Sequence, residues 1–142
     1  MPTQPTFFGQ MTDFFKQQAP EEIEPDESMN LLFFKQDLGD FKSLFYIQPK
    51  PQGFKTTIRV QDEFPLNTEE NAENWEADLQ SRYTQCQFSR EGTIIQADCG
   101  QKIDIPLLPK IENLPVLDTK LGELSSQLWE NTLNKISQEM YE

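Results

Sequence analysis

The sequence contains no histidine and only two cysteines among its 142 residues. Without histidine a Ser-His-Asp nucleophilic site cannot form, and two isolated cysteines supply only half of the ligands of a structural zinc site. The phosphate-binding patterns G-x-x-x-x-G-K-S/T and G-x-G-x-x-G are also absent. The carboxylates of Asp37 and Asp40 flank Gly39 in a predicted turn, where they serve the backbone rather than proton transfer. We therefore predict that the protein is not an enzyme and uses no metal or cofactor.

Basic residues are scarce as well, because 12 Lys and Arg stand against 24 Asp and Glu, a formal net charge of −12. Nucleic acids and anionic membrane surfaces are recognised by neutralising phosphates with Lys and Arg, so we expect neither as a partner. The charge instead favours a protein client with a basic or amphipathic segment. Solubility alone explains the charge equally well.

Long apolar runs and targeting signals are missing too. The longest apolar run, Leu31-Leu32-Phe33-Phe34, is far shorter than the roughly 20 residues that span a bilayer. Residues 1–10 have neither the cationic start nor the apolar centre of a signal peptide, and no lipidation motif is present. We expect a soluble, cytoplasmic protein.

Phenylalanine is the abundant apolar residue, with eleven copies. Each buried aromatic ring removes roughly 150–250 Å² from water, so a chain of this length can fold as one domain over residues 1–142. Apolar residues recur at helical spacing near both ends and in the centre of the chain, and they alternate between the helices. The patterns predict helices at 5–18, 67–83 and from about 115, and strands at 30–36, 41–48, 54–60, 85–88 and 93–98, with a short edge strand at 103–107.

This order predicts an α+β fold, in which an antiparallel sheet of about five strands is packed by an N-terminal, a central and a C-terminal helix (α-βββ-α-ββ-α). Residues 20–28 form a run of acids around Pro25 and are predicted to be a solvated linker. Residues 105–115 are rich in proline and are predicted to be an irregular connection.

The two cysteines, Cys86 and Cys99, lie on the two strands of the second predicted hairpin. If residues 89–92 form its turn, with Gly92 in a left-handed bulge position, Cys86 lies opposite Gln96. Cys99 is then three residues further along, and at about 3.3 Å per residue this exceeds the roughly 7 Å limit between the Cα atoms of a disulfide. We expect two free, mostly buried thiols.

Aromatic residues come in adjacent pairs, at Phe7 and Phe8, at Phe14 and Phe15, and at Phe33 and Phe34. One face of a helix cannot easily bury all four N-terminal rings. They either fill the core or form an exposed patch that contacts a client or a second copy of the chain. The candidate apolar contact residues are Phe7, Phe8, Met11, Phe14 and Trp129.

Carboxylates crowd the central helix, where Glu69, Glu73 and Glu76 can share one face. They are either a solvated face that complements the helix dipole or an acidic surface for a basic partner. A divalent-ion site is the least favoured of the interpretations.

The chain resembles YbjN-like domains and type III secretion chaperones. The similarity lies in a Phe-rich N-terminal helix before a three-strand meander, in the helix 75–83 that leads into the hairpin 86–95, and in an amphipathic C-terminal helix. The proline-rich stretch 105–115 is long for this family. The resemblance implies a dimeric or pairing protein that binds an extended segment of a client, without cofactor or turnover.

Two functions are compatible with these patterns. The first is a non-enzymatic protein-binding module, a chaperone or adaptor that uses an apolar helix surface and an acidic patch and that can form a homodimer. The alternative is an acidic decoy or immunity-type inhibitor, whose carboxylates occupy a basic enzyme or a nucleic-acid-binding protein.

Overall fold

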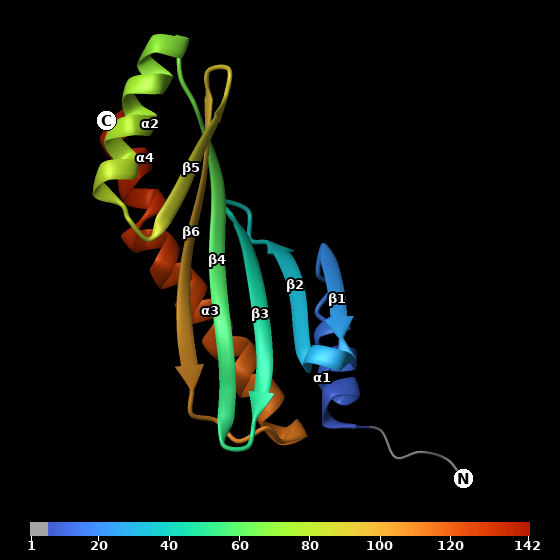
Figure 1. Ribbon diagram of the computed structural model, residues 1–142. Helices are drawn as coiled ribbons and strands as arrows, with labels where there is room; N and C mark the ends of the chain where they lie inside the picture. Colours follow the sequence, from blue (N-terminus) through green and yellow to red (C-terminus); the bar gives the residue numbers. More distant parts are fainter. Residues whose placement is uncertain (1–5) are drawn as a thin grey trace.

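The computed structural model describes residues 6–142 as one antiparallel sheet with helices packed against it (Figure 1). The sheet has six strands in the order β1-β2-β3-β4-β6-β5. The strands are β1 Glu22–Asp26, β2 Leu31–Asp37, β3 Lys42–Lys50, β4 Gly53–Pro65, β5 Cys86–Glu91 and β6 Ile94–Ile105. The helices are α1 Phe7–Lys16, α2 Glu69–Arg82, α3 Leu114–Asn131 and α4 Leu133–Tyr141, with short 3-10 turns at Glu27–Met29 and Ile111–Asn113. The predicted α+β fold is confirmed.

Buried side chains alternate with solvent-facing ones along the strands, and this alternation separates the two faces of the sheet. On β4, Phe54, Ile58 and Val60 are buried, whereas Lys55 and Arg59 between them point to the other side. Directly paired residues of neighbouring antiparallel strands share a face, so the register carries this division across the sheet. One face is therefore apolar and the other mostly polar.

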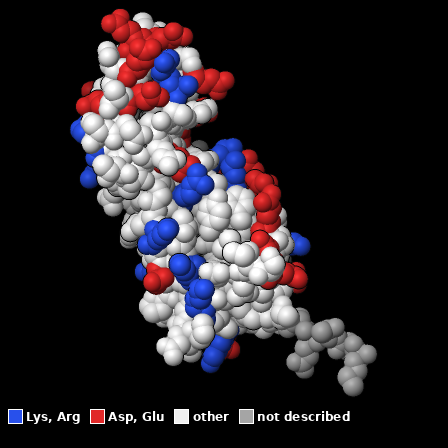
Figure 2. Space-filling model, in the orientation of Figure 1, with Lys and Arg blue, Asp and Glu red and all other residues white. Residues whose placement is uncertain are grey.

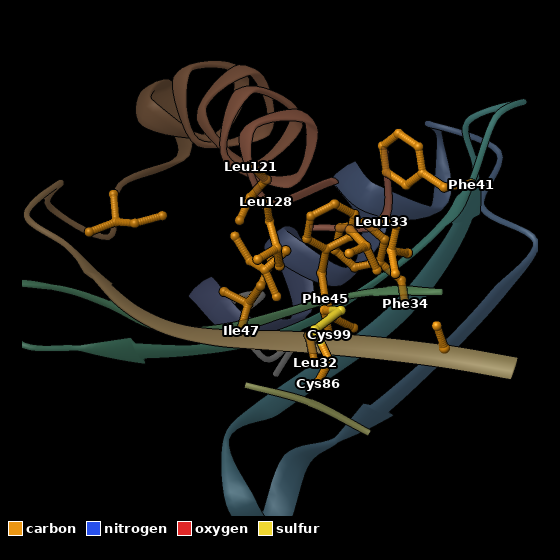
Figure 3. Packing of buried hydrophobic residues seen from close by; sticks show 14 of the residues in the cluster. Leu32, Phe34, Phe41, Phe45, Ile47, Cys86, Cys99, Leu121, Leu128 and Leu133 are labelled. Atoms are coloured by element: carbon orange, nitrogen blue, oxygen red, sulfur yellow. A yellow bond between two sulfur atoms is a disulfide. The ribbon is translucent and has the colours of Figure 1, made fainter. Parts of the chain in front are cut away.

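The helices cover the apolar face. From α1, the ring of Phe15 stacks on Phe34 with 4.7 Å between centroids. From the C-terminal half, Leu121 and Leu128 of α3 point toward the sheet residues Phe45 and Ile47 (Figure 3). Helices α2 and α4 lie beside each other at the far end of the sheet, where Arg82 pairs with Glu139 at 2.9 Å (Figure 1). Their buried side chains belong to the same core cluster as those of α1 and α3.

The acidic segment 20–28 is not a solvated linker, because residues 22–26 form β1 at the edge of the sheet. Ile23 lies opposite Phe34 on the apolar face, and the carboxylates of Glu22, Glu24 and Asp26 alternate with it toward solvent. Pro25 is tolerated because an edge strand needs hydrogen bonds on one side only. The acidic side chains concealed this five-residue alternation in the sequence. β1 is the strand beyond the five that were predicted.

Three further predictions differ from the structure in the C-terminal half. Residues 103–105 are not a separate edge strand, because β6 continues to Ile105 and pairs with β4 along its length. The proline-rich connection is shorter than predicted, since α3 already begins at Leu114. The single predicted helix is broken at Thr132, whose hydroxyl donates to the carbonyl of Leu128.

The cysteine prediction is wrong, because Cys86 and Cys99 form a disulfide. The hairpin turns over two residues: Glu91 pairs with Ile94, and Gly92 takes a left-handed φ of 64° between them. This shorter turn moves the partner of Cys86 from Gln96 to Cys99, and their Cα atoms are 4.0 Å apart. Both cysteines are buried in the core (Figure 3).

Candidate binding face

The predicted apolar contact residues lie mostly in the core. Met11 is fully buried and Phe8 is 8% exposed, so neither is available to a partner in this conformation. Phe7 and Phe14 are half-buried and pack against Phe54 and Phe15 respectively. The core interpretation of the N-terminal rings, left open by the sequence, is the one that the structure supports.

Trp129, the C-terminal candidate, is also half-buried. Its indole stacks on the ring of Phe41 with 5.0 Å between centroids and 12° between planes. This contact holds α3 against the beginning of β3, so Trp129 packs one element on another rather than standing free.

The predicted acidic residues lie on α2. Glu69 and Glu73 are exposed and Glu76 is half-buried, and Glu73 accepts a hydrogen bond from Arg90 at 3.1 Å. Figure 2 shows carboxylates gathered at the α2 end of the molecule. Among residues 6–142, no three or more Cys, Asp or Glu side chains are grouped closely enough to hold a metal ion.

The face of the sheet opposite the helices is uncovered, and a strip of apolar side chains crosses its middle. Phe33 on β2 lies directly opposite Tyr46 on β3, and their ring centroids are 4.9 Å apart. Leu31 precedes Phe33 on the same face, and Leu44, which is 8% exposed, lies on it beside Tyr46. Both rings are half-buried, and neither belongs to the core cluster on the other face. We name these four residues the aromatic strip.

Charge is divided on the two sides of the aromatic strip. Glu22, Glu24 and Asp26 line it along β1, and Lys55, Arg59 and Lys102 lie beyond it on β4 and β6. Figure 2 shows this division, with red atoms along the β1 edge, white atoms beside them and blue atoms over the middle strands. An acidic chain thus carries an apolar strip between an acidic border and a basic border.

A hydrogen-bonded cluster anchors the basic side of the strip. The guanidinium of Arg59 donates to both oxygens of Asp98 and, at 3.2 Å, to the hydroxyl of Tyr46. Gln61 donates to the same carboxylate at 2.8 Å. The hydrogen bond with Asp98 raises the pKa of Arg59, so the guanidinium stays ionised. The cluster fixes the position of the Tyr46 ring.

A groove of about 680 Å³ runs between the aromatic strip and β1. Hydrogen bonds from the Ser28 hydroxyl and the Met29 N–H lower the pKa of Asp26 at its rim, which keeps that carboxylate charged. The groove is lined by Glu22, Glu24, Pro25, Asp26, Glu27, Leu31, Phe33 and Tyr46.

A second hollow of about 880 Å³ lies between the β2–β3 turn and β5. Carboxylates of Asp37, Asp40 and Asp62 border it together with Lys35 and Lys42. Burial raises the pKa of Asp62, whose carboxylate accepts the N–H of Glu63 at 2.8 Å. Asp37 likewise accepts the N–H of Gly39 at 2.9 Å, and we assign no chemistry to this hollow.

Sequence reasoning missed the groove because it treated residues 20–28 as a linker. A signal was present in the pair Phe33–Phe34, because adjacent residues of a strand point to opposite faces. If Phe34 is buried, Phe33 must lie on the other side. No family model, curated protein or solved structure matches this chain.

Proposed function

We propose that this protein is a non-enzymatic binding module, a chaperone or adaptor, that holds a segment of a protein client on the open face of its sheet. The observation that carries the proposal is the pair Phe33 and Tyr46, half-buried outside the core and lining the groove of about 680 Å³. Aromatic rings that line a surface groove are typical of sites that bind another macromolecule. The surface differs from the helix surface expected from the sequence, whereas the kind of function is the same.

The compartment is part of this proposal. Buried, disulfide-bonded cysteines favour an oxidising compartment over the cytoplasm predicted from the sequence. Mass spectrometry after alkylation in denaturant, without reductant, tests this on protein taken from its native source. An unmodified mass supports the oxidising compartment, and two alkylated cysteines contradict it.

Pull-down from the native extract tests the binding function. We expect the wild-type protein to retain a client that a variant with Phe33→Ala and Tyr46→Ala releases. Val116→Ala is the matched control, because Val116 is 55% exposed on α3, within the helix layer. Circular dichroism checks that both variants are folded. Capture that is equal for wild type and the double variant would contradict the proposal.

A homodimer, which the sequence analysis allowed, is tested by light scattering over a range of concentrations. A mass that rises with concentration supports self-association, and a constant monomer mass rules it out under those conditions.

The acidic decoy is a second candidate, because exposed carboxylates gather at the α2 end of the molecule (Figure 2). Glu69 and Glu70 are exposed there, although Glu73 is already paired with Arg90. A decoy requires a complex with a basic protein that weakens steeply as salt rises. Glu69→Gln with Glu70→Gln must then weaken the complex, and an unchanged complex excludes this function.

A further inference from the structure

We infer that the groove beside β1 binds a basic side chain of the client, an arginine or lysine that adjoins an apolar residue, against the rings of Phe33 and Tyr46 and the carboxylates of Glu24 and Asp26. This inference rests on the proposed function and specifies the chemistry of its client.

The first argument is the placement of one carboxylate and two rings in a single row across three strands. Glu24 of β1 lies directly opposite Phe33 of β2, which lies directly opposite Tyr46 of β3. Directly opposite residues have Cβ atoms roughly 4.5–5.5 Å apart. A cation that stands over the rings is therefore within reach of the carboxylate, and aromatic faces attract cations in such positions.

The second argument is the pairing of the acids on this border. Glu21 accepts a hydrogen bond from Lys42 at 3.2 Å, and Glu22 lies opposite Lys35. Glu24 lies opposite Phe33 and Asp26 lies opposite Leu31, so neither has a cation across the strand. None of the ion pairs within residues 6–142 includes Glu24, Asp26 or Glu27. Their charge is left for a partner.

The third argument concerns the occupant. Two of the cations on the open face of this chain already face carboxylates, because Asp98 holds Arg59 and Asp104 lies opposite Lys55, whereas Lys102 lies opposite Thr57. A second copy of the chain also carries the net charge of −12, and this like charge opposes its docking against the acidic β1 border. The apolar floor, formed by Leu31, Phe33 and Tyr46, matches an apolar residue next to the basic one. A basic, amphipathic segment of another protein satisfies both requirements.

The test uses the full-length protein and short synthetic peptides in which leucine alternates with arginine. In a matched peptide, citrulline replaces arginine, which retains the shape and removes the charge. We expect the arginine peptide to bind about tenfold more tightly than the citrulline peptide, as for a cation between rings and carboxylates. Isothermal titration calorimetry measures both affinities, and NMR shift changes must centre on β1 and β2.

Two double variants test whether the arginine peptide binds at the groove beside β1. Glu24→Gln with Asp26→Asn should reduce affinity for the arginine peptide by about tenfold and leave the citrulline peptide unchanged. Glu69→Gln with Glu70→Gln on α2 makes the same change in net charge away from the groove and should have no such effect. If the two double variants weaken the arginine peptide equally, the attraction is non-specific and the inference is wrong.

Other outcomes separate this inference from the proposed function. If the citrulline peptide binds on this face as tightly as the arginine peptide, the open face binds segments but the basic specificity is wrong. If neither peptide binds and client capture is insensitive to Phe33→Ala and Tyr46→Ala, the proposed function fails as well. A dimer that Phe33→Ala dissociates would identify a second copy as the occupant and overturn the inference.

Discussion

Gln80 and Phe88 are joined across the outer edge of β5, where the backbone N–H of Phe88 donates to Oε1 of Gln80 at 3.1 Å. Nε2 of the same side chain donates to the carbonyl of Cys86 at 2.9 Å. One amide from α2 thus takes the place of a neighbouring strand. Unpaired strand edges invite association with other chains. Because this edge is occupied, the open face is a better place than the β5 edge for a partner to dock.

Removal of the Gln80 side-chain amide tests how much it contributes to the stability of the fold. Gln80→Ala should lower the free energy of unfolding by roughly 1–2 kcal/mol, because two hydrogen bonds to the edge are lost. Urea denaturation measures the change. Asn74→Ala, an exposed position on the same helix, should change the stability by much less. Equal effects of the two substitutions would show that helix propensity, and not the edge, is responsible.

The disulfide should stabilise the fold by about 3 kcal/mol, the size expected for a closed loop of this length. Cys86 and Cys99 are separated by 13 positions, and both are almost fully buried. Thermal unfolding with and without reductant measures the difference. The variant with Cys86→Ala and Cys99→Ala should melt near the reduced wild type and show no response to reductant. Identical melting of oxidised and reduced wild type would refute this role.

Adjacent phenylalanines on β2 should respond differently to truncation. Phe34 is 1% exposed and stacks between Phe15 and Phe45, so Phe34→Ala should cost about 3–5 kcal/mol of stability. Phe33 is half-buried on the open face, and Phe33→Ala should cost less, about 1–2 kcal/mol from the aromatic pair and partial burial together. Chemical denaturation of the two variants measures the contrast. Similar losses would mean that the open face is part of the core.

Replacement by alanine should change the stability of the fold in opposite directions at two glycines. A Cβ at Gly53 would lie 2.6 Å from the carbonyl oxygen of Ile105, so Gly53→Ala should destabilise the fold by roughly 1–3 kcal/mol. A Cβ at Gly122 meets no atom within 4 Å, so Gly122→Ala in the exposed face of α3 should stabilise by up to about 1 kcal/mol. Thermal melting of both variants measures the two changes in stability. Stabilisation by Gly53→Ala would contradict the close approach of the β3–β4 turn to Ile105.

Asp62 should make stability fall as pH rises. Burial raises the pKa of its carboxyl in the folded protein above the ordinary value of 3.8, so the folded state binds the proton more tightly than the unfolded state. Stability is therefore lost as pH increases through the interval from 3.8 to the raised pKa. Asp62→Asn should be more stable than wild type at pH 7, and the gain should vanish below that interval. Asp13→Asn, at an exposed position of α1, is the control. A constant gain at every pH would exclude titration as its cause.

Much of the sheet was predictable because its signals are local. Phe54, Ile58 and Val60 alternate with polar residues, and this pattern predicts both the strand and its buried side. The strand β1 was missed because only Ile23 on it is apolar enough to mark the inner face. The burial of the predicted contact residues Phe8 and Met11 could not be predicted, since an amphipathic pattern indicates that a face is apolar but not what covers it. In this protein, the sheet covers the face that Phe8 and Met11 present.

The sequence by itself determined the acidic surface, the order of the strands β2 to β6 among the helices, and the lack of histidine-based chemistry, because these depend on composition and on spacing within a few residues. Only the tertiary structure decided that Cys86 meets Cys99, that an acidic segment becomes an edge strand, and that Glu24, Phe33 and Tyr46 form one row. Those three features depend on the register between strands. A turn at Gly92 and Thr93 in place of the predicted turn changes every pairing beyond it, and the packing of the whole sheet selects the turn.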